Sequence, residues 1–132
     1  MSLCILFGGA VAAALPIEAF TLSWHHTIEK VEWQEDYRVV PGGLRLVEAR
    51  VRGAGAGMEP PAGAFLRDGW WHYVPDLPLL PALTLANAAE AGEWRLCREG
   101  NCRTLPDLAG RPQPHVLPQA TLRPCREDED HE

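Results

Sequence analysis

The stretch from Phe20 to Val40, FTLSWHHTIEKVEWQEDYRVV, decides the fold that the sequence predicts. Apolar and polar side chains alternate along it, and a period of two is typical of β-strands with one buried face. A phase change at residues 29–32 indicates two antiparallel strands joined by a short turn. The residues that share the buried face are Phe20, Leu22, Trp24, His26 and Ile28 on the first strand and Val31, Trp33, Glu35, Tyr37 and Val39 on the second.

His26 and Glu35 are polar residues on this otherwise apolar face. A hairpin that pairs Leu22 with Val39 also places His26 opposite Glu35. A carboxylate beside an imidazole raises the pKa of the histidine and fixes its tautomer. Such a pair serves a general base or orients a metal ligand, but buried polar groups also pair simply to satisfy one another. The sequence leaves the functional and the structural interpretation open.

A third antiparallel strand is expected at residues 44–51, directly after the turn signal Pro41–Gly43. If Val39 pairs near Leu44, Glu48 falls beside Glu35. One histidine and two carboxylates could then hold a divalent metal. No ligand spacing in the sequence requires this, so we assign no metal and no cofactor.

The rest of the chain is divided into short segments by its 12 glycines and 12 prolines. Many short strands with frequent turns predict an all-β fold, either a small antiparallel β-sandwich or a partly open barrel. We expect one such domain over residues 20–124. Further strands are expected at residues 70–74, 83–86, 94–97, 102–105 and 115–122, the last as an edge strand because Pro118 lacks a backbone donor.

Residues 3–17, LCILFGGAVAAALPI, carry no charge. They are too short for a membrane helix, which needs about 20 apolar residues. They fit the apolar region of a signal peptide, with residues 12–14 as the Ala-x-Ala cleavage site, although no Lys or Arg precedes them. We therefore expect residues 1–19 to be a signal peptide or an N-terminal hydrophobic segment. An uncleaved anchor, which would be the only contact with the membrane, and an ordinary buried segment are the alternatives.

The cysteines support export to the periplasm or to the outer face of the inner membrane. Cys97 and Cys102 flank four residues that read as a hairpin turn, and opposed residues in a hairpin lie close enough for a disulfide. Disulfides persist in oxidising compartments. Cys4 would leave with a signal peptide, and Cys125 then has no evident partner.

The charge pattern excludes several classes of function. The formal net charge is −6 and no basic stripe is present, so nucleic acid is not expected as a partner. Residues 125–132 form an acidic tail that we expect to be disordered.

The nucleophile motif GxSxG is absent, and we assign no catalytic residue. The glycine-rich residues 53–57 lack the Lys-Ser/Thr pair of a phosphate loop, and a close-packed turn or a ligand lid is expected instead.

Four motifs follow one another along the chain after residue 20. They are Trp24-His25-His26-Thr27-Ile28-Glu29-Lys30, Trp33-Gln34-Glu35-Asp36-Tyr37, Gly55-Ala56-Gly57-Met58 and Asp68-Gly69-Trp70-Trp71. In their order and spacing they resemble an uncharacterised bacterial family, domain of unknown function 1850, and the resemblance covers most of the chain after residue 20. Family members more often have serine where this chain has Thr27.

The resemblance implies an accessory of solute uptake outside the cytoplasm. Members of the family are often encoded beside tripartite ATP-independent periplasmic (TRAP) transporters of the TAXI type, so a TRAP membrane subunit, a solute-binding protein or a small solute is the expected partner. A small hydrolase or metal-dependent enzyme that uses His26 and Glu35, and a structural domain of the cell envelope, are the alternatives. The resemblance supplies these candidate functional or binding positions: His26, Thr27, Glu29, Glu35, Gly55, Gly57 and Met58.

Overall fold

The computed structural model describes residues 1–26, 31–52, 63–85, 94–108, 110 and 119–129, with only the backbone of His26 and Val31. Most of this described part is β-strand, because short alternating segments are separated by glycine and proline turns. The elements are β1 (Leu3–Phe7), β2 (Ala10–Leu15), β3 (Ala19–His26), β4 (Val31–Val40), β5 (Gly43–Arg52), β6 (Phe65–Arg67), β7 (Trp70–Tyr73), β8 (Leu83–Leu85), β9 (Trp94–Arg98), β10 (Asn101–Thr104), α1 (Leu105–Leu108), β11 (Ala120–Pro124) and the 3₁₀ turn η2 (Glu127–Glu129).

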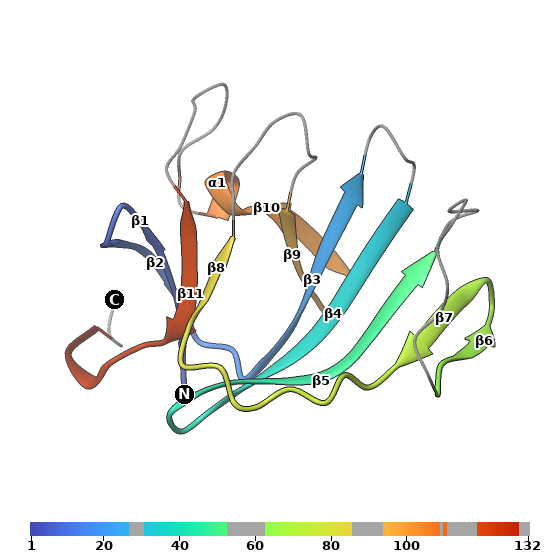
Figure 1. The fold of residues 1–132 in the computed structure, drawn as a ribbon. Helices are drawn as coiled ribbons and strands as arrows, with labels where there is room; N and C mark the ends of the chain where they lie inside the picture. The colour runs from blue at the N-terminus through green and yellow to red at the C-terminus, as the bar shows by residue number, and fades with distance from the viewer. Residues whose placement is uncertain (27–30, 53–62, 86–93, 109, 111–118, 130–132) are drawn as a thin grey trace.

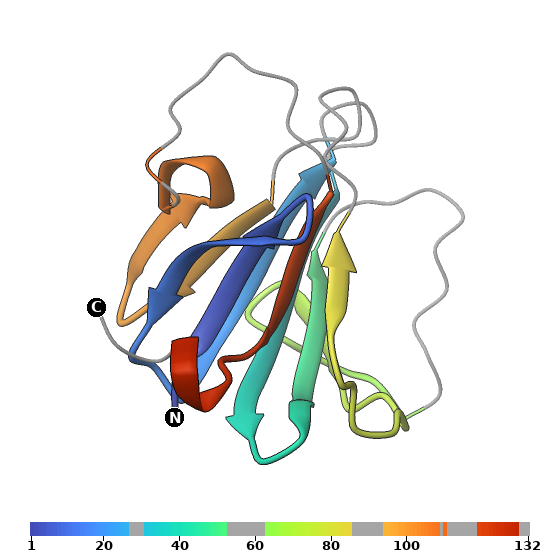
Figure 2. The ribbon, with the colours of Figure 1, turned by 90° about the vertical axis from the view of Figure 1, so that its left-hand side faces the viewer.

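The described strands form two sheets that pack face to face (Figures 1 and 2). One has four strands in the order β2-β1-β11-β8, and the other has seven in the order β10-β9-β3-β4-β5-β7-β6. The strand pairs in both sheets are antiparallel. The all-β prediction is therefore confirmed, and of its two architectures the sandwich is observed, since these sheets do not close into a barrel.

The core lies between the two sheets and draws on both ends of the chain. Apolar side chains at alternate positions of β1, β3 and β8 point into it, as expected for packed sheets. The buried cluster consists of Leu3, Ile5, Phe7, Ile17, Phe20, Leu22, Tyr37, Val39, Leu44, Leu85, Leu96, Leu105, Ala120 and Leu122.

The N-terminal apolar segment is part of this core. Strands β1 and β2 form a hairpin, and β1 lies between β2 and β11 in the four-stranded sheet. Leu3 and Ile5 are fully buried. Residues 3–15 therefore pack as a hairpin against the rest of the sandwich. Loss of residues 1–19 would remove two of the four strands of that sheet.

The β3–β4 hairpin has the predicted faces but a different register. Leu22 lies opposite Glu35, and His26 lies opposite Val31 rather than Glu35. The shift from Glu35 to Val31 is four residues, an even number, so every side chain keeps its predicted face. Cross-strand aromatic pairs explain the observed register, because Phe20 now stacks on Tyr37 with ring centroids 5.5 Å apart. The predicted pairing of His26 with Glu35 is wrong.

A β-bulge separates β4–β5 pairing into two halves. Tyr37 pairs with Leu46 as predicted, but the register shifts there, and Asp36 pairs with Glu48. Val47 is the extra residue on β5. An extra residue reverses the faces of everything beyond it. Glu35 consequently pairs with Ala49, and the predicted approach of Glu48 to Glu35 is wrong.

The predicted strands at residues 70–74, 83–86, 94–97 and 102–105 are observed within one or two residues. The predicted last strand begins later, as β11 at Ala120, and it lies between β1 and β8. The expectation of an edge strand is therefore wrong. Pro118, on which that expectation rested, lies outside the described residues.

The C-terminal end is attached to the N-terminal strand. Cys4 and Cys125 form a disulfide, and the backbone N–H of Cys125 donates to the carbonyl oxygen of Ser2 at 2.9 Å. Arg123 forms a salt bridge of 2.8 Å with Glu129 in η2. The expectations of an unpaired Cys125 and of a disordered tail are thus not met for residues 125–129. Residues 130–132 lie outside the described residues.

The predicted hairpin disulfide is confirmed. Cys97 and Cys102 are directly opposite each other in the β9–β10 ladder, and they are bonded. Both disulfides are compatible with a protein exported to an oxidising compartment. No helix in the described part of the chain is long and apolar enough to cross a membrane.

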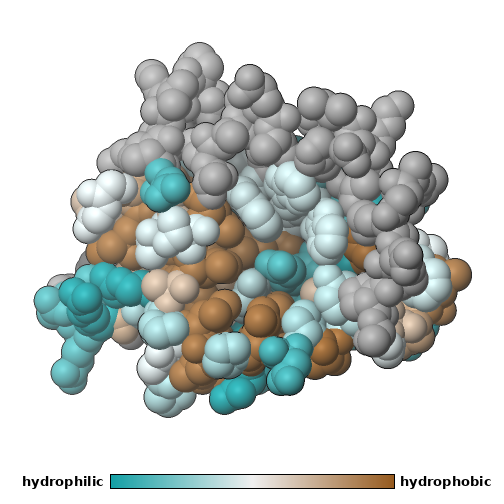
Figure 3. Space-filling view, viewed as in Figure 1, coloured by the Kyte–Doolittle hydropathy of each residue, from teal (hydrophilic) through white to brown (hydrophobic). Residues whose placement is uncertain are grey.

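The surface is mixed in polarity. In the view of Figure 3, hydrophobic residues reach the surface beside hydrophilic ones, and the hydrophilic group at the lower left lies where Figure 1 draws η2. Several exposed apolar side chains come from one stretch of the chain that starts at β6, namely Phe65, Leu66, Val74, Leu77 and Leu79.

The two disulfides should contribute unequally to stability. Cys4–Cys125 closes a loop with a sequence separation of 121 residues, whereas Cys97–Cys102 closes one of 5. Loop-closure entropy predicts that C4A/C125A lowers the free energy of unfolding by about 5 kcal/mol and C97A/C102A by about 2 kcal/mol. Urea denaturation of both variants measures the difference. Equal losses would contradict the attachment of the N-terminal hairpin to the C-terminal end.

Candidate functional site

The structure describes two of the seven sequence-predicted positions. Glu35 is described fully and His26 by its backbone, while the other five lie outside the described residues: Thr27, Glu29, Gly55, Gly57 and Met58. His26 pairs with Val31, which is four residues from Glu35 along β4, a distance of roughly 13 Å. The structure therefore does not bring His26 and Glu35 together.

Glu35 has a different partner. The hydroxyl of buried Tyr37 donates to Oε1 of Glu35 at 2.9 Å. Burial and then the Glu35 carboxylate raise the pKa of Tyr37 well above its usual value. Tyr37 therefore stays protonated and remains a donor. This hydrogen bond holds the Glu35 side chain against Tyr37 along β4.

Strands β3 and β5 end at the same end of the seven-stranded sheet, and the segments that hold the other candidate positions follow them in the chain. His26, the last residue of β3, pairs with Val31, and Arg52, the last residue of β5, pairs with Glu32. Residues 27–30 and 53–62 follow these two strand ends in the chain.

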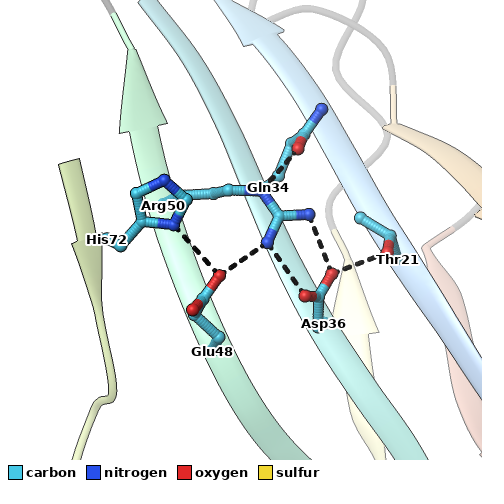
Figure 4. Close-up of polar contacts among 6 residues, drawn as sticks. All are labelled: Thr21, Gln34, Asp36, Glu48, Arg50 and His72. Atoms are coloured by element: carbon cyan, nitrogen blue, oxygen red, sulfur yellow. Dashed lines mark hydrogen bonds and ion pairs between the residues drawn. The ribbon is translucent and has the colours of Figure 1, made fainter. Parts of the chain in front are cut away.

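A network of polar side chains lies on the outward face of the seven-stranded sheet, across β3, β4, β5 and β7 (Figure 4). The bulge at Val47 places Glu48 and Arg50 on this face, and period-two alternation does the same for residues of β3, β4 and β7. Its members are Thr21, Gln34, Asp36, Glu48, Arg50 and His72.

Arg50 is the centre of the network. Its Nη1 and Nη2 donate to the two oxygens of Asp36 at 2.8 and 3.0 Å, a bidentate pair. Nη1 also donates to Glu48 Oε1 at 2.9 Å, and Nε donates to Gln34 Oε1 at 2.7 Å. The Arg50 side chain is 18% exposed, against 32% for Asp36 and 30% for Glu48. Partial burial makes these pairs stronger than fully exposed ones.

Asp36 is held as a carboxylate. Burial by itself raises its pKa. The hydrogen bonds from Arg50 and from the Thr21 hydroxyl, the latter at 2.6 Å, together with the charge of Arg50 outweigh this effect, so the pKa of Asp36 lies below its usual value. The bond to Asp36 likewise raises the pKa of Arg50. A base works best when its pKa is near the working pH. Asp36 is thus suited to binding and orientation rather than to proton transfer.

His72 extends the network to β7. Its Nδ1 lies 3.2 Å from Glu48 Oε1, and its ring stacks on Phe65 with centroids 5.2 Å apart. Beside it, the guanidinium of Arg52 lies 5.7 Å from the ring centroid of Trp70, a cation–π contact. The network therefore ends in a cluster of aromatic and cationic groups near the β6–β7 hairpin.

An open groove of about 800 Å³ lies beside the network. Thr21, Asp36 and Arg50 line it, and so does the bulge residue Val47. The other walls come from residues 16–20, from Tyr37 and Arg38, and from residues 97–99 at the end of β9 and the start of its hairpin turn. Its volume is within the range of ligand pockets, about 300–1,000 Å³.

The chemistry of this face favours binding. The charges at its centre are paired, and among the described residues every buried side-chain polar atom has a partner. The described residues also contain no group of three His, Cys, Asp or Glu that could hold a metal ion. Thr21, Asp36 and Arg50 therefore present fixed donors, acceptors and charges to the groove.

The sequence analysis did not identify Arg50, Asp36 or His72 as candidate site residues. One available signal was that Asp36 and Gln34 alternate with the apolar residues of β4, and that Arg50 and Arg52 do so on β5. Such outward rows of opposite charge on neighbouring strands can form cross-strand pairs. Finding the site would have required the correct register as well.

Comparison with known proteins identifies a family. The family model described as "Domain of unknown function (DUF1850)" matches residues 20–105, more than half of the chain. The chain therefore belongs to this family. Neither the curated proteins nor the solved structures contain a significant match to it.

Removal of Arg50 should destabilise the fold. Arg50→Ala leaves the half-buried carboxylates of Asp36 and Glu48 without their cation, and we expect a loss of about 2 kcal/mol in the free energy of unfolding. Arg45→Ala is the matched control, because Arg45 is an exposed arginine on the same strand; its loss should be under about 0.5 kcal/mol. Urea denaturation at neutral pH compares the two. Similar losses would show that the network contributes no stability.

Proposed function

We propose that this chain is a non-catalytic binding domain outside the cytoplasm, an accessory of solute transport by TRAP transporters of the TAXI type. Its partner is a TRAP membrane subunit or solute-binding protein, and the groove beside Arg50 is the binding surface. The observation that carries the proposal is this groove, which has a ligand-pocket volume and is lined in part by Thr21, Asp36 and Arg50, whose polar groups are held by hydrogen bonds to one another. Preorganised groups of this kind bind with little ordering cost.

Two disulfides support the location. Thiols in the cytoplasm are kept reduced, whereas disulfides persist in the periplasm. Cys97 lines the groove and Cys102 is exposed, so their bond would be open to cytoplasmic reductants. A periplasmic location also places the chain in the compartment where TRAP transport takes up its solute.

Family membership supports the link to transport. Members of the family that this chain resembles are often encoded beside TAXI-type TRAP transporters. A small domain with a polar groove suits an accessory role in such transport. The alternative of an enzyme that uses His26 and Glu35 has no geometric support, because the β3–β4 register separates the two residues. The remaining alternative is a structural domain of the cell envelope. In that case the groove would bind neither a transporter protein nor a solute.

Filling the groove should weaken the complex. Val47 lines the groove and is 41% exposed, so Val47→Trp reduces the groove without burying new polar groups. Val11 is equally exposed at 41% but lies on β2 in the other sheet, and Val11→Trp is the matched control. The measurement is native mass spectrometry of the protein purified from the periplasm with a co-expressed TRAP membrane subunit and solute-binding protein.

We expect a stable complex for the unmodified chain and for Val11→Trp. For Val47→Trp we expect the complex to weaken by tenfold or more, on the order of 1.4 kcal/mol or above. Absence of any complex with the unmodified chain contradicts the transport role. A complex that survives Val47→Trp unchanged contradicts the groove as its binding surface.

A further inference from the structure

The inner face of the seven-stranded sheet, which is turned toward the four-stranded sheet, carries a row of tryptophans. Directly opposed residues of neighbouring strands lie on the same face of a sheet. The row runs from β9 to β6 and is separate from the polar network, which lies on the outward face. Its members, in order, are Trp94, Trp24, Trp33, Val51, Trp71 and Leu66.

A second row on the same face contains a carboxylate. Leu22 pairs with Glu35 across β3 and β4. Glu35 pairs in turn with Ala49 on β5, and Ala49 pairs with Tyr73 on β7. Leu22 belongs to the buried core, which identifies this face as the inner one. Glu35 therefore lies on the inner face of the sheet, two residues from Trp33 along β4.

The two rows together form a trough over β5. Its floor consists of Ala49 and Val51, whose small side chains are 1% and 2% exposed. Its walls are half-buried side chains of β4 and β7, namely Trp33 and Glu35 on one side and Trp71 and Tyr73 on the other. Two strand spacings, roughly 10 Å, separate the backbones of the two walls.

The core cluster does not extend to the tryptophans of these walls. Neither Trp33 nor Trp71 is among the residues that pack against it. Figure 1 shows that the two sheets diverge toward the end at which β3 and β5 end, and Figure 3, from the same side, shows pale and hydrophilic residues at the centre of the view with hydrophobic residues around them. Within the described part of the chain, neither indole has a hydrogen bond or a ring contact. Among these residues, both rings are available to a ligand.

Glu35 has no cationic partner among the described residues. One of its oxygens accepts the hydroxyl of Tyr37, and it takes part in no ion pair there. Every buried side-chain polar atom in this part of the chain has a partner, so the second oxygen of Glu35 is reached by solvent. Burial and then the Glu35 carboxylate raise the pKa of Tyr73, which stays protonated and supplies no positive charge. A half-buried carboxylate without a counterion favours the binding of a cation.

We propose that this trough binds an organic cation whose positive charge is a methylated ammonium group. The cation lies over the floor, between the rings of Trp33 and Trp71, and pairs with Glu35. Midway between the walls it is about 5 Å from each, within the roughly 6 Å at which an aromatic ring attracts a cation. The inference does not rest on the transport role, because no residue of the trough lines the groove.

The composition of the trough selects a methylated ammonium group against other charged groups. A primary ammonium is strongly hydrated and carries three donors, whereas the trough offers its charge on a single carboxylate between aromatic and apolar side chains. Methyl groups lose no hydrogen bonds on leaving water, and the faces of two tryptophans attract the charge that they surround. An anion would be repelled by Glu35.

The test is a titration of the ¹⁵N-labelled full chain with choline, followed through the indole N–H signals in two-dimensional NMR. We expect saturable shifts for Trp33 and Trp71. Two further probes isolate the features of choline: the alcohol in which carbon replaces its nitrogen lacks the charge, and ethanolamine lacks the methyl groups. Each should bind at least about tenfold more weakly than choline, because each lacks one part of the interaction.

A pair of variants on β4 tests the carboxylate. Glu35→Gln removes the charge but keeps an acceptor for the Tyr37 hydroxyl, so we expect a folded protein that binds choline at least about tenfold more weakly. Glu32→Gln is the matched control, because Glu32 lies three residues away on the same strand and therefore on the opposite face. It should bind choline as tightly as the unmodified chain.

A pair of variants on β7 tests the aromatic wall. Trp71→Leu removes one of the two rings and should also weaken choline binding at least about tenfold. Trp70→Leu is its control, because Trp70 is the neighbouring residue and lies on the outward face, where Arg52 stacks on it. It should leave the affinity for choline unchanged.

Three results would overturn the inference. The first is the absence of saturable shifts of Trp33 and Trp71 with choline. The second is binding of the neutral alcohol or of ethanolamine as tight as that of choline, and the third is an unchanged affinity of Glu35→Gln. None of these results affects the complex measured by native mass spectrometry, whose proposed surface is the groove. The failure of this inference is therefore distinguishable from the failure of the proposed function.

Discussion

The bulge at Val47 is the constraint on which the rest of the structure depends. Side chains on a strand alternate with a period of two, so one extra residue exchanges the faces of all that follow. Before the bulge, Leu44 and Leu46 fill the core, and after it Ala49 and Val51 do so. An unbroken ladder would turn Arg50 toward the core, where an unpaired charge is very costly.

The bulge also explains why the polar network lies beside a groove. It aims Glu48 and Arg50 outward next to Asp36, so three charges meet on a partly exposed face. Pairing there keeps Asp36 ionised and holds the side chains of both carboxylates in place. Val47 itself becomes one wall of the groove. A single backbone irregularity therefore links the packing of the core to the surface proposed to bind a partner.

The sequence predicted faces better than registers. Alternation alone determines which side chains share a face, and for β3 and β4 this was right. Register depends on which cross-strand pairs pack best, and here the stacking of Phe20 on Tyr37 replaced the expected pairing of Leu22 with Val39. The bulge is, however, visible in the sequence as a change in the alternation of apolar residues. In LRLVEARVR, the apolar residues occupy even positions up to Leu46 and odd positions from Val47 onward.

Distance along the chain limited the other predictions. The Cys97–Cys102 bond follows from a local hairpin, whereas Cys4–Cys125 joins opposite ends of the chain and needs the assembled sheet. An apolar run such as residues 3–15 has the same composition as a signal peptide and as a buried hairpin. The candidate site draws on β3, β4, β5 and β7 together, so it could not emerge from any one motif.

The most direct test of this account is the pairing of β4 with β5 in solution, measured from cross-strand nuclear Overhauser effects between backbone protons. The account predicts contacts that join Tyr37 to Leu46 and Asp36 to Glu48, with Val47 unpaired. Contacts that join Glu35 to Glu48 in an unbroken ladder would contradict it. They would remove both the Arg50 network and the groove proposed to bind a partner.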